Sequence, residues 1–223
     1  MALAVWRRLA RAEARVAGDG ATVAGVDEAG RGPLAGPVVA AAVVLDPAVR
    51  WKGIHDSKQV DPETRAKLYA QVLLQARAFG WSVIGPRAID RMNIRRASLE
   101  AMRRAVVRLR IQPTLVLVDG ADRVPGLLIA QQAVIDGDAR MLSIAAASIV
   151  AKVVRDRIME RLDRVWPVYG FARHKGYSTP EHFEALGRHG PCPLHRYSYA
   201  PVAFQDLPFD APPAETPVPV EAS

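Results

Sequence analysis

Four carboxylate side chains share one property, which is that each closely follows a short apolar run: Asp27, Glu28, Asp119 and Asp138. Open α/β sheets place their sites at the carboxyl ends of such strands. Four ionised carboxylates carry four negative charges, which two divalent cations would neutralise, and hard oxygen ligands favour Mg²⁺ or Mn²⁺. Two such ions can clamp the attacking and leaving oxygens of a phosphate during an in-line displacement. The pattern therefore indicates metal-assisted chemistry at a phosphate.

Each of these carboxylates also has a structural alternative, because Asp is common in turns and at helix N-caps. Asp138 precedes a helical segment, so capping that helix is its alternative role. The four together favour a site, since a carboxylate after a buried strand costs free energy unless a positive group satisfies it. Asp27 and Glu28 add a condition, because neighbouring strand residues point to opposite faces. Both serve one site only if the strand ends or twists there, which Gly30 would allow.

The charge of the chain is unevenly distributed. Its 223 residues include 30 Lys and Arg against 23 Asp and Glu, a net charge of +7. Residues 204–223 contain four acidic residues and no basic one, so removing their charge of −4 leaves +11 on residues 1–203. A body this basic favours a polyanionic partner, although an arginine-rich surface inherited from a GC-rich genome is the alternative. Together with the carboxylates, the charge points to cutting or joining a nucleic-acid backbone.

The composition excludes several classes of protein. Half of the residues are hydrophobic and 24% are charged, which is typical of a globular protein and not of a disordered chain. Cys192 is the single cysteine, so a disulfide scaffold is excluded and a reducing, cytoplasmic compartment is expected. The longest apolar stretch, 33–45, is shorter than the roughly 20 residues of a membrane span. The first 17 residues lack the apolar core of a secretory signal, so we expect no membrane association.

Alternating strands and helices must position these side chains. Apolar and alternating runs predict strands at 22–26, 38–45, 79–84, 114–118 and 133–135. Helical periodicity and capping residues, including Asp61 and Thr179, predict helices at 3–17, 62–77, 94–110, 142–165 and 180–187. This alternation favours a layered α/β domain. We expect a helical extension over 1–21, one catalytic domain over 22–203 and a disordered, proline-rich acidic tail over 204–223.

The segment 27–38, Asp-Glu-Ala-Gly-Arg-Gly-Pro-Leu-Ala-Gly-Pro-Val, closely resembles the signature of the ribonuclease HII family, the type 2 ribonucleases H. The resemblance continues, in order, through Asp56-Ser57-Lys58, Leu117-Val118-Asp119-Gly120, Gly137-Asp138, 143–152, Arg155-Asp156, Tyr169-Gly170-Phe171, His174-Lys175-Gly176-Tyr177 and His195-Arg196-Tyr197-Ser198. It covers about residues 22 to 203. Several blocks in the right order are far more specific than any lone motif.

The resemblance implies a ribonuclease H-like fold, with a central mixed sheet flanked by helices and a helical C-terminal part. It implies an endoribonuclease that cleaves the RNA strand of RNA–DNA hybrids and nicks duplex DNA on the 5′ side of a single embedded ribonucleotide. Such an enzyme uses Mg²⁺ or Mn²⁺ in a two-metal site and leaves 3′-hydroxyl and 5′-phosphate ends. We expect it to act as a monomer without an obligate protein partner.

The resemblance also assigns residues. Carried over by position, the metal-binding and catalytic carboxylates are Asp27, Glu28, Asp119 and Asp138. The loop Gly30-Arg31-Gly32 senses the ribose 2′-hydroxyl, and Tyr177 packs on the neighbouring sugar. Further substrate-binding candidates are Lys58, Ser148 and Lys152, although Lys152 has a solvated pair with Asp156 as its alternative. One departure is Asp136, where the family more often has a basic or neutral residue.

The chemistry of the glycine loop agrees with that assignment. Telling RNA from DNA means reading one hydroxyl, which both donates and accepts a hydrogen bond. Glycines at 30 and 32 remove the Cβ atoms that would keep the backbone away from a sugar, and Arg31 between them can hold a phosphate. The histidines cluster late, and their spacing with Cys192 is not a zinc pattern.

Two other functions remain open. One is a nuclease of the same fold that cuts DNA junctions or ends, for which the glycine loop would have no hydroxyl to read. The other is a nucleic-acid binding protein without catalysis, in which the carboxylates are structural and need no divalent cation.

Overall fold

The computed structural model describes residues 2–54 and 60–203, with side chains from residue 5 onward. A five-stranded sheet with strand order β3-β2-β1-β4-β5 lies at its centre. β1 pairs in parallel with β4, and β4 with β5, whereas β2 runs antiparallel to both β1 and β3. The strands are β1 (Val23–Ala29), β2 (Val38–Val44), β3 (Ala78–Ile84), β4 (Leu115–Asp119) and β5 (Ala130–Val134).

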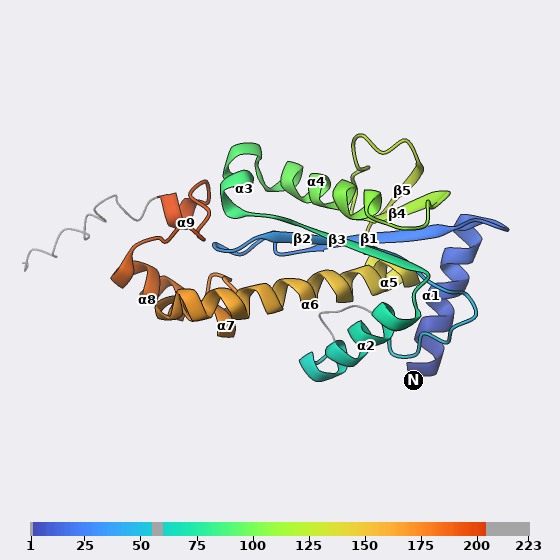
Figure 1. Ribbon diagram of the computed structural model, residues 1–223, viewed down its shortest axis with the longest axis horizontal. Helices are drawn as coiled ribbons and strands as arrows, with labels where there is room; N and C mark the ends of the chain where they lie inside the picture. Colours follow the sequence, from blue (N-terminus) through green and yellow to red (C-terminus); the bar gives the residue numbers. More distant parts are fainter. Residues whose placement is uncertain (1, 55–59, 204–223) are drawn as a thin grey trace, which may run out of the picture.

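Helices cover both faces of the sheet (Figure 1). α3 (Pro86–Met92) and α4 (Ile94–Val107) lie on one face, and α2 (Pro62–Gln75) and α6 (Leu142–Val165) lie on the other. β2 is buried at all seven residues and contains only Val and Ala, because a strand covered on both faces has no solvent side to make polar. The core is therefore two apolar layers separated by the sheet.

The first half of α6 comes unusually close to β1. Its residues 145–148, three alanines and Ser148, are buried against the sheet. A Cβ atom added to Gly25 of β1 would lie 2.2 Å from the backbone nitrogen of Ile144. Only glycine permits this approach, which brings the α6 backbone directly under the strand that ends in Asp27 and Glu28.

α1 (Ala2–Ala17) stands beside the start of α6 and supplies its N-terminal cap. Met141 at the N-cap position of α6 has no side-chain oxygen to accept from the first turn. Instead, the backbone N–H and the hydroxyl of Ser143 both donate to Oε2 of Glu13, at 2.7 and 2.8 Å. Burial raises the pKa of the Glu13 carboxyl. The segment before the first strand is thus part of the support of α6.

Short helical segments complete the C-terminal part. They are α5 (Gly137–Arg140), η2 (Pro167–Tyr169), α7 (Phe171–His174), α8 (Pro180–His189) and α9 (Ala200–Ala203). α7, α8 and α9 gather around the C-terminal end of α6, at the opposite end of the molecule from α1 (Figure 1). Within the ranges described, no helix combines the length and the apolar character needed to cross a membrane.

The predicted mixed sheet, flanking helices and helical C-terminal part are confirmed. Helix 142–165 has the predicted bounds, and Asp61 and Thr179 cap their helices by accepting from the backbone N–H groups of Thr64 and His182. Helix 94–110 was predicted too long, since α4 ends at Val107. Four short α-helices, α3, α5, α7 and α9, and the 3₁₀ helix η2 were not predicted.

Two strand predictions were wrong in extent. β1 continues past residue 26 to Ala29, and β5 covers 130–134 and not 133–135. The proposed division at residues 21 and 203 stays a prediction, and the predicted tail, 204–223, lies outside the described residues.

Candidate active site

The predicted carboxylates meet where β1 and β4 part. The last residue pair in the ladder between them is Val26 with Val118, so Asp27, Glu28 and Asp119 all follow it. Burial raises the pKa of Asp27 well above its ordinary value, and the charges of Glu28 and Asp119 raise it further. Burial also raises the pKa of Glu28, Arg31 opposes that rise, and Asp119 adds to it. These three carboxylates therefore repel one another in a poorly solvated place.

Asp27 and Glu28 lie within the strand, so their side chains leave it on opposite faces. Asp27 shares its face with Gly25, which touches α6, and it hydrogen-bonds the Ser148 side chain of that helix. Glu28 lines a hollow of about 30 Å³ on the α4 side, together with Asp119. β1 ends at Ala29, directly after these two carboxylates, and Asp119, the last residue of β4, acts electrostatically on both.

Asp138 is adjacent to this group through α5. The backbone N–H of Gly137 donates to Oδ1 of Asp119 at 2.7 Å, and Asp138 is the next residue, buried at 8% exposure. Asp138 lies inside α5 and the N-cap position of α6 is Met141, so Asp138 is not the N-cap residue of the long helix.

Asp136 has a local structural explanation. It adopts the left-handed conformation, with φ 53° and ψ 42°, immediately before α5. Asp and Asn tolerate this conformation better than other residues with a Cβ atom. The departure from the family pattern at this position therefore occurs at a backbone turn that suits an aspartate.

The donor chemistry of the site fits a divalent cation, although the side chains do not form a closed ligand set as they stand. In the described part of the chain, no group of three or more His, Cys, Asp and Glu side chains is arranged to hold a metal ion. The mutual repulsion of Asp27, Glu28 and Asp119 is what a bound cation would relieve. Arg31, whose Nη1 lies 3.3 Å from Oε1 of Glu28, relieves it at that residue.

Two buried arginines hold the glycine loop, and the first is Arg196. Its guanidinium donates to the carbonyl oxygens of Gly30, Arg31 and Gly36 and to the hydroxyl of Tyr199. The side chain is fully buried, and burial lowers its pKa. Because the planar guanidinium presents five N–H groups in fixed directions, it fixes the backbone of the loop on both sides of Arg31.

Arg155 of α6 is the second. It donates to the carbonyl oxygens of Pro37 at 3.1 Å, Ala35 at 3.4 Å and Lys175 at 2.9 Å, and it lies 5.6 Å from the ring centre of Tyr177. Burial lowers its pKa to about 10. The arginine therefore links the glycine loop to the segment that carries Tyr177.

Gly30 has an internal reason to be glycine. Its φ is +97°, and an added Cβ would lie 2.0 Å from Nε of Arg155. Gly32 differs, because a Cβ there would meet nothing within 4 Å. Arg31 between them is exposed, and so is Tyr177, at 43% of its surface. The loop thus presents an open surface at Gly32 above a tightly packed Gly30.

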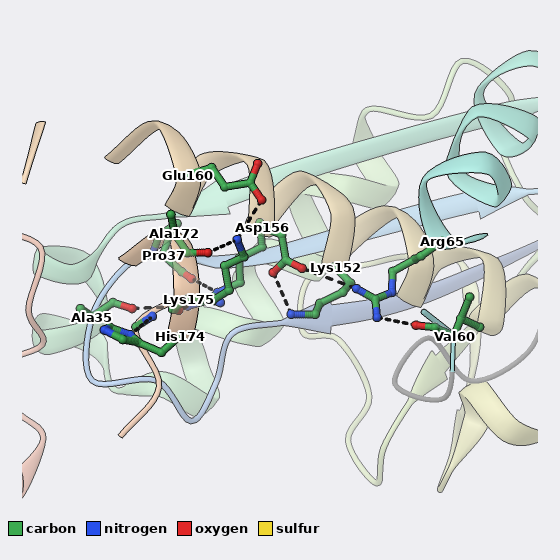
Figure 2. A network of polar contacts seen from close by, with 12 residues as sticks. Ala35, Pro37, Val60, Arg65, Lys152, Asp156, Glu160, Ala172, His174 and Lys175 are labelled. Atoms are coloured by element: carbon green, nitrogen blue, oxygen red, sulfur yellow. Dashed lines mark hydrogen bonds and ion pairs between the residues drawn. The ribbon is translucent and has the colours of Figure 1, made fainter. Parts of the chain in front are cut away.

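The weaker substrate-binding candidates lie along α6 and beside it. Nζ of Lys152 lies 2.7 Å from Oδ1 of Asp156, and Arg65 of α2 approaches the other oxygen of Asp156 at 3.6 Å. Figure 2 shows Lys152 and Arg65 converging on Asp156, with Arg65 also reaching the carbonyl of Val60. The ion pair of Lys152 with Asp156, which was the structural alternative to substrate binding by Lys152, is thus present. Lys58 lies outside the described residues.

Sequence reasoning missed the residues that act through others. It named Arg155 and Arg196 as members of blocks in the family resemblance, and it gave neither them nor the histidines a role in holding the backbone. Some of their contacts are distant in the sequence: Arg155 reaches the carbonyl of Lys175, 20 positions away, and Arg196 reaches that of Gly30, 166 positions away, which periodicity does not reveal. The available signal for Arg155 was a basic residue directly after the apolar pair Val153 and Val154.

Comparison with known proteins adds independent information. The family model described as ribonuclease HII matches residues 24–202. The ribonuclease HII of Agrobacterium fabrum is 57% identical over 180 residues, which cover 81% of this chain and 82% of that protein. The crystal structure of ribonuclease H2 from Pyrococcus horikoshii OT3 superposes with a TM-score of 0.71 at 30% identity, covering 82% of this chain and 96% of that one.

Two further structures have the same fold. Ribonuclease HII from Archaeoglobus fulgidus, solved in a complex with PCNA, has a TM-score of 0.67 at 28% identity and covers 78% of this chain and 93% of that one. Bst-RNase HIII, solved in complex with Mn²⁺, has a TM-score of 0.71 at 19% identity and covers 92% and 72%.

Proposed function

Because this chain belongs to the ribonuclease HII family, which cleaves the RNA of RNA–DNA hybrids, we propose that it also nicks duplex DNA on the 5′ side of a single embedded ribonucleotide. The observation that carries the proposal is the juxtaposition of two features. A cluster of mutually repelling carboxylates lies at the end of β1, and the rigidly held loop Gly30-Arg31-Gly32 follows it directly. One feature suits hydrolysis of a phosphodiester, and the other suits the reading of a ribose.

The catalytic group in this proposal is Asp27, Glu28, Asp119 and Asp138, with Mg²⁺ or Mn²⁺ as the cofactor. Two cations bound there would lower the pKa of a water nucleophile and neutralise charge on the scissile phosphate. The chain itself orients the carboxylates. Asp27 accepts from the backbone N–H of Glu28, and Asp119 accepts from that of Gly137. The Mn²⁺ complex of the Bst-RNase HIII structure supports a divalent cation in this fold.

Substrate selection rests on the loop and on Tyr177. Gly32 leaves its backbone open to a sugar, and the exposed guanidinium of Arg31 suits a neighbouring phosphate. The exposed ring of Tyr177 suits the face of the adjoining sugar. Contacts at Ser148, Lys152 and Lys58 would add to the hold on the phosphate backbone. The similar curated proteins are bacterial, which supports a cytoplasmic location in this proposal. The proposal also takes the enzyme to act as a monomer.

The test is cleavage of a DNA duplex that carries one ribonucleotide, with Mg²⁺ or Mn²⁺ present. We expect a single nick on the 5′ side of the ribonucleotide, with 3′-hydroxyl and 5′-phosphate ends. An all-deoxyribose duplex of the same sequence should stay intact. Cleavage of that duplex would favour a nuclease for DNA junctions or ends, and no cleavage of either would contradict the proposal.

The role of the carboxylates is tested by Asp119→Asn, which we expect to abolish turnover while leaving folding and duplex binding intact. Asp46→Asn is the matched control, because Asp46 follows β2, which runs antiparallel, and so lies at the other end of the sheet. Calorimetric titration with Mg²⁺ should show binding to the wild type and to the Asp46 variant, and weaker binding to the Asp119 variant. Full activity of Asp119→Asn would move the metal site elsewhere, and no Mg²⁺ binding at all would favour a non-catalytic binding protein.

A further inference from the structure

Three buried histidines lie behind Tyr177, and neither the proposed chemistry nor the loop uses them. The rings of His174 and His182 are stacked, with centroids 4.5 Å apart, and the ring of His195 lies 5.3 Å from that of His182. His182 and His195 are 0% and 1% exposed. They come from different parts of the C-terminal region, since His182 belongs to α8 and His195 follows it in a loop.

The carbonyl of Tyr177 determines which ring nitrogens of His182 and His195 donate and which accept hydrogen bonds. Nδ1 of His182 lies 2.8 Å from that oxygen, which only accepts, so this nitrogen carries a proton. In a neutral His182 the other nitrogen, Nε2, is then an acceptor. It lies 3.1 Å from Nε2 of His195, which must therefore donate.

His195 completes the sequence of bonds. With its proton on Nε2, its Nδ1 accepts from the backbone N–H of Cys192 at 3.0 Å. The opposite tautomers would let Nδ1 of His195 donate to the Cys192 carbonyl at 3.3 Å, but they would set two acceptors against each other at Tyr177. Burial lowers the pKa of His195 to about 4 and lowers that of His182, which keeps both rings neutral. One arrangement of protons therefore satisfies every partner.

The same cluster holds the other side of Tyr177. The backbone N–H of Tyr177 donates to the carbonyl of His174 at 2.9 Å, and the N–H of Gly176 donates to Nδ1 of His174 at 3.1 Å. Lys175, with φ 53°, and Gly176, with φ 81°, both adopt left-handed conformations in this turn. Glycine adopts this conformation freely, whereas Lys175 does so at a cost in conformational energy, so the turn depends on the contacts around it.

We infer that His182 and His195 form a neutral two-imidazole relay that fixes the backbone of Tyr177 and thereby positions its exposed ring for the sugar next to the ribonucleotide. This role rests on the proposed function, because it deepens the part that Tyr177 plays there. Both histidines are positioning residues, since neither ring is exposed to a substrate. The relay ends at the Tyr177 carbonyl, whose carbon is bonded directly to the Cα atom that carries the side chain.

The first test is spectroscopic and independent of activity. Nitrogen-15 NMR of the imidazoles at neutral pH should show His195 protonated on Nε2 and His182 protonated on Nδ1, with both rings uncharged. The reverse tautomers, or a charged ring at neutral pH, would overturn the relay whatever the activity of the enzyme.

The second test is a double-mutant cycle between His182→Phe and Tyr177→Ala on the duplex with one ribonucleotide. Loss of one hydrogen bond to the turn should raise KM about tenfold and leave kcat nearly unchanged. In the Tyr177→Ala background the same change should alter KM less than about twofold, because the ring to be positioned is gone. Equal effects in both backgrounds would mean that His182 only stabilises the fold, which contradicts the inference.

Two more variants serve as a conservative replacement of His182 and as a matched control. His182→Asn retains an N–H near the position of Nδ1, so it should restore KM to within about threefold of the wild type. His189→Phe is the matched control, because His189 is exposed at the end of the same helix and contacts Tyr169 only by its ring edge. If Tyr177→Ala alone leaves KM unchanged, the assigned role of Tyr177 fails, whereas the NMR result still decides the relay.

Discussion

Arg196 illustrates how a single buried residue shapes the loop that we propose to read the substrate. Its guanidinium is buried with no carboxylate among its hydrogen-bond partners, and it donates to three carbonyl oxygens of the segment that leaves β1. Carbonyl oxygens bear partial negative charge, so the loop backbone stabilises the cation that holds it. Shape and charge at the loop therefore depend on one side chain far along the sequence.

Replacement of Arg196 by lysine should keep the positive charge of the side chain and remove the planar arrangement of its donors. An ammonium group offers three donors and no planar fork, so at least one of the carbonyls of Gly30, Arg31 and Gly36 loses its partner. We expect the free energy of unfolding to fall by about 1–3 kcal/mol. KM for the ribonucleotide duplex should rise more than kcat falls, as measured by urea denaturation and steady-state kinetics.

Arg188→Lys is the matched control, since Arg188 is exposed and pairs with Glu184 on α8. It should change stability by less than about 0.5 kcal/mol. Equal losses in the two variants would contradict the role of Arg196 as the residue that shapes the loop.

At the residue scale, sequence reasoning found the side chains that we propose to face a substrate, and it missed those that bind the backbone. Asp27, Glu28 and Asp119 could be predicted because each ends an apolar run, a signal confined to a few neighbours. Arg196 has no such signal, because the carbonyl oxygens of Gly30, Arg31 and Gly36 are brought near it only by the tertiary fold. His182 bonds to a carbonyl only five residues away, yet no periodicity marks that contact. Their roles in binding remain predictions, as do those of the carboxylates.

Among the elements, α1 contributes to the core and to the support of α6, although it lies outside the residues that match the family model. The match begins at residue 24, yet Glu13 of α1 accepts two hydrogen bonds from Ser143 and Leu9 is 1% exposed in the core. The helix that it caps, α6, carries Ser148, which hydrogen-bonds Asp27. Support for Asp27, one of the proposed catalytic carboxylates, therefore begins in the first helix.

The Glu13→Ala variant should be destabilised by about 1–2 kcal/mol, because the first turn of α6 loses its acceptor and Ser143 has no substitute. Chemical denaturation followed by circular dichroism measures this change. Glu63→Ala on α2 is the control, since the partner of Glu63 is the exposed Lys67. A loss as small as the control's would show that solvent can cap α6 equally well.

The predicted bounds of β1 and β5 differ from those in the structure, and each difference has a local cause. β5 was predicted too short because Gln131 and Gln132 interrupt an apolar pattern. The side chain of Gln131 forms hydrogen bonds with both the N–H and the carbonyl of Val124, so its polarity serves the preceding loop and not solvent. β1 was predicted to stop at residue 26 because the carboxylates that follow look like a strand end, although they continue the ladder with β2.

For the whole molecule, the sheet separates two helical layers, and α7, α8 and α9 gather around the C-terminal end of α6 (Figure 1). The buried histidines there have a consequence for overall stability. Burial lowers the pKa of His195 from 6.5 to about 4, so the folded chain binds fewer protons than the unfolded chain between those values. The stability contribution is complete above pH 6.5 and is lost progressively as the pH falls toward 4.

The free energy of unfolding should therefore decrease as the pH falls through this range, and His195→Phe should show a shallower decrease than the wild type. Urea denaturation at several pH values measures both slopes. His189→Phe should keep the slope of the wild type, because its ring is exposed. Parallel slopes for the wild type and the His195 variant would assign the acid sensitivity to other groups.

The bonds from Arg196 to Gly30 and Arg31 also set an order of assembly during synthesis. They join positions 166 and 165 residues apart, so the loop receives its fixing side chain only after nearly the whole described chain has been made. Chains grow from the N-terminus, and contacts of such long range form late. A growing chain that has already completed β1, β4 and α6 holds every proposed catalytic carboxylate, yet it lacks the anchor of the loop that would select a ribose. By the proposed roles, the anchor of the loop for selecting a ribose is thus synthesised after the residues proposed for cleavage.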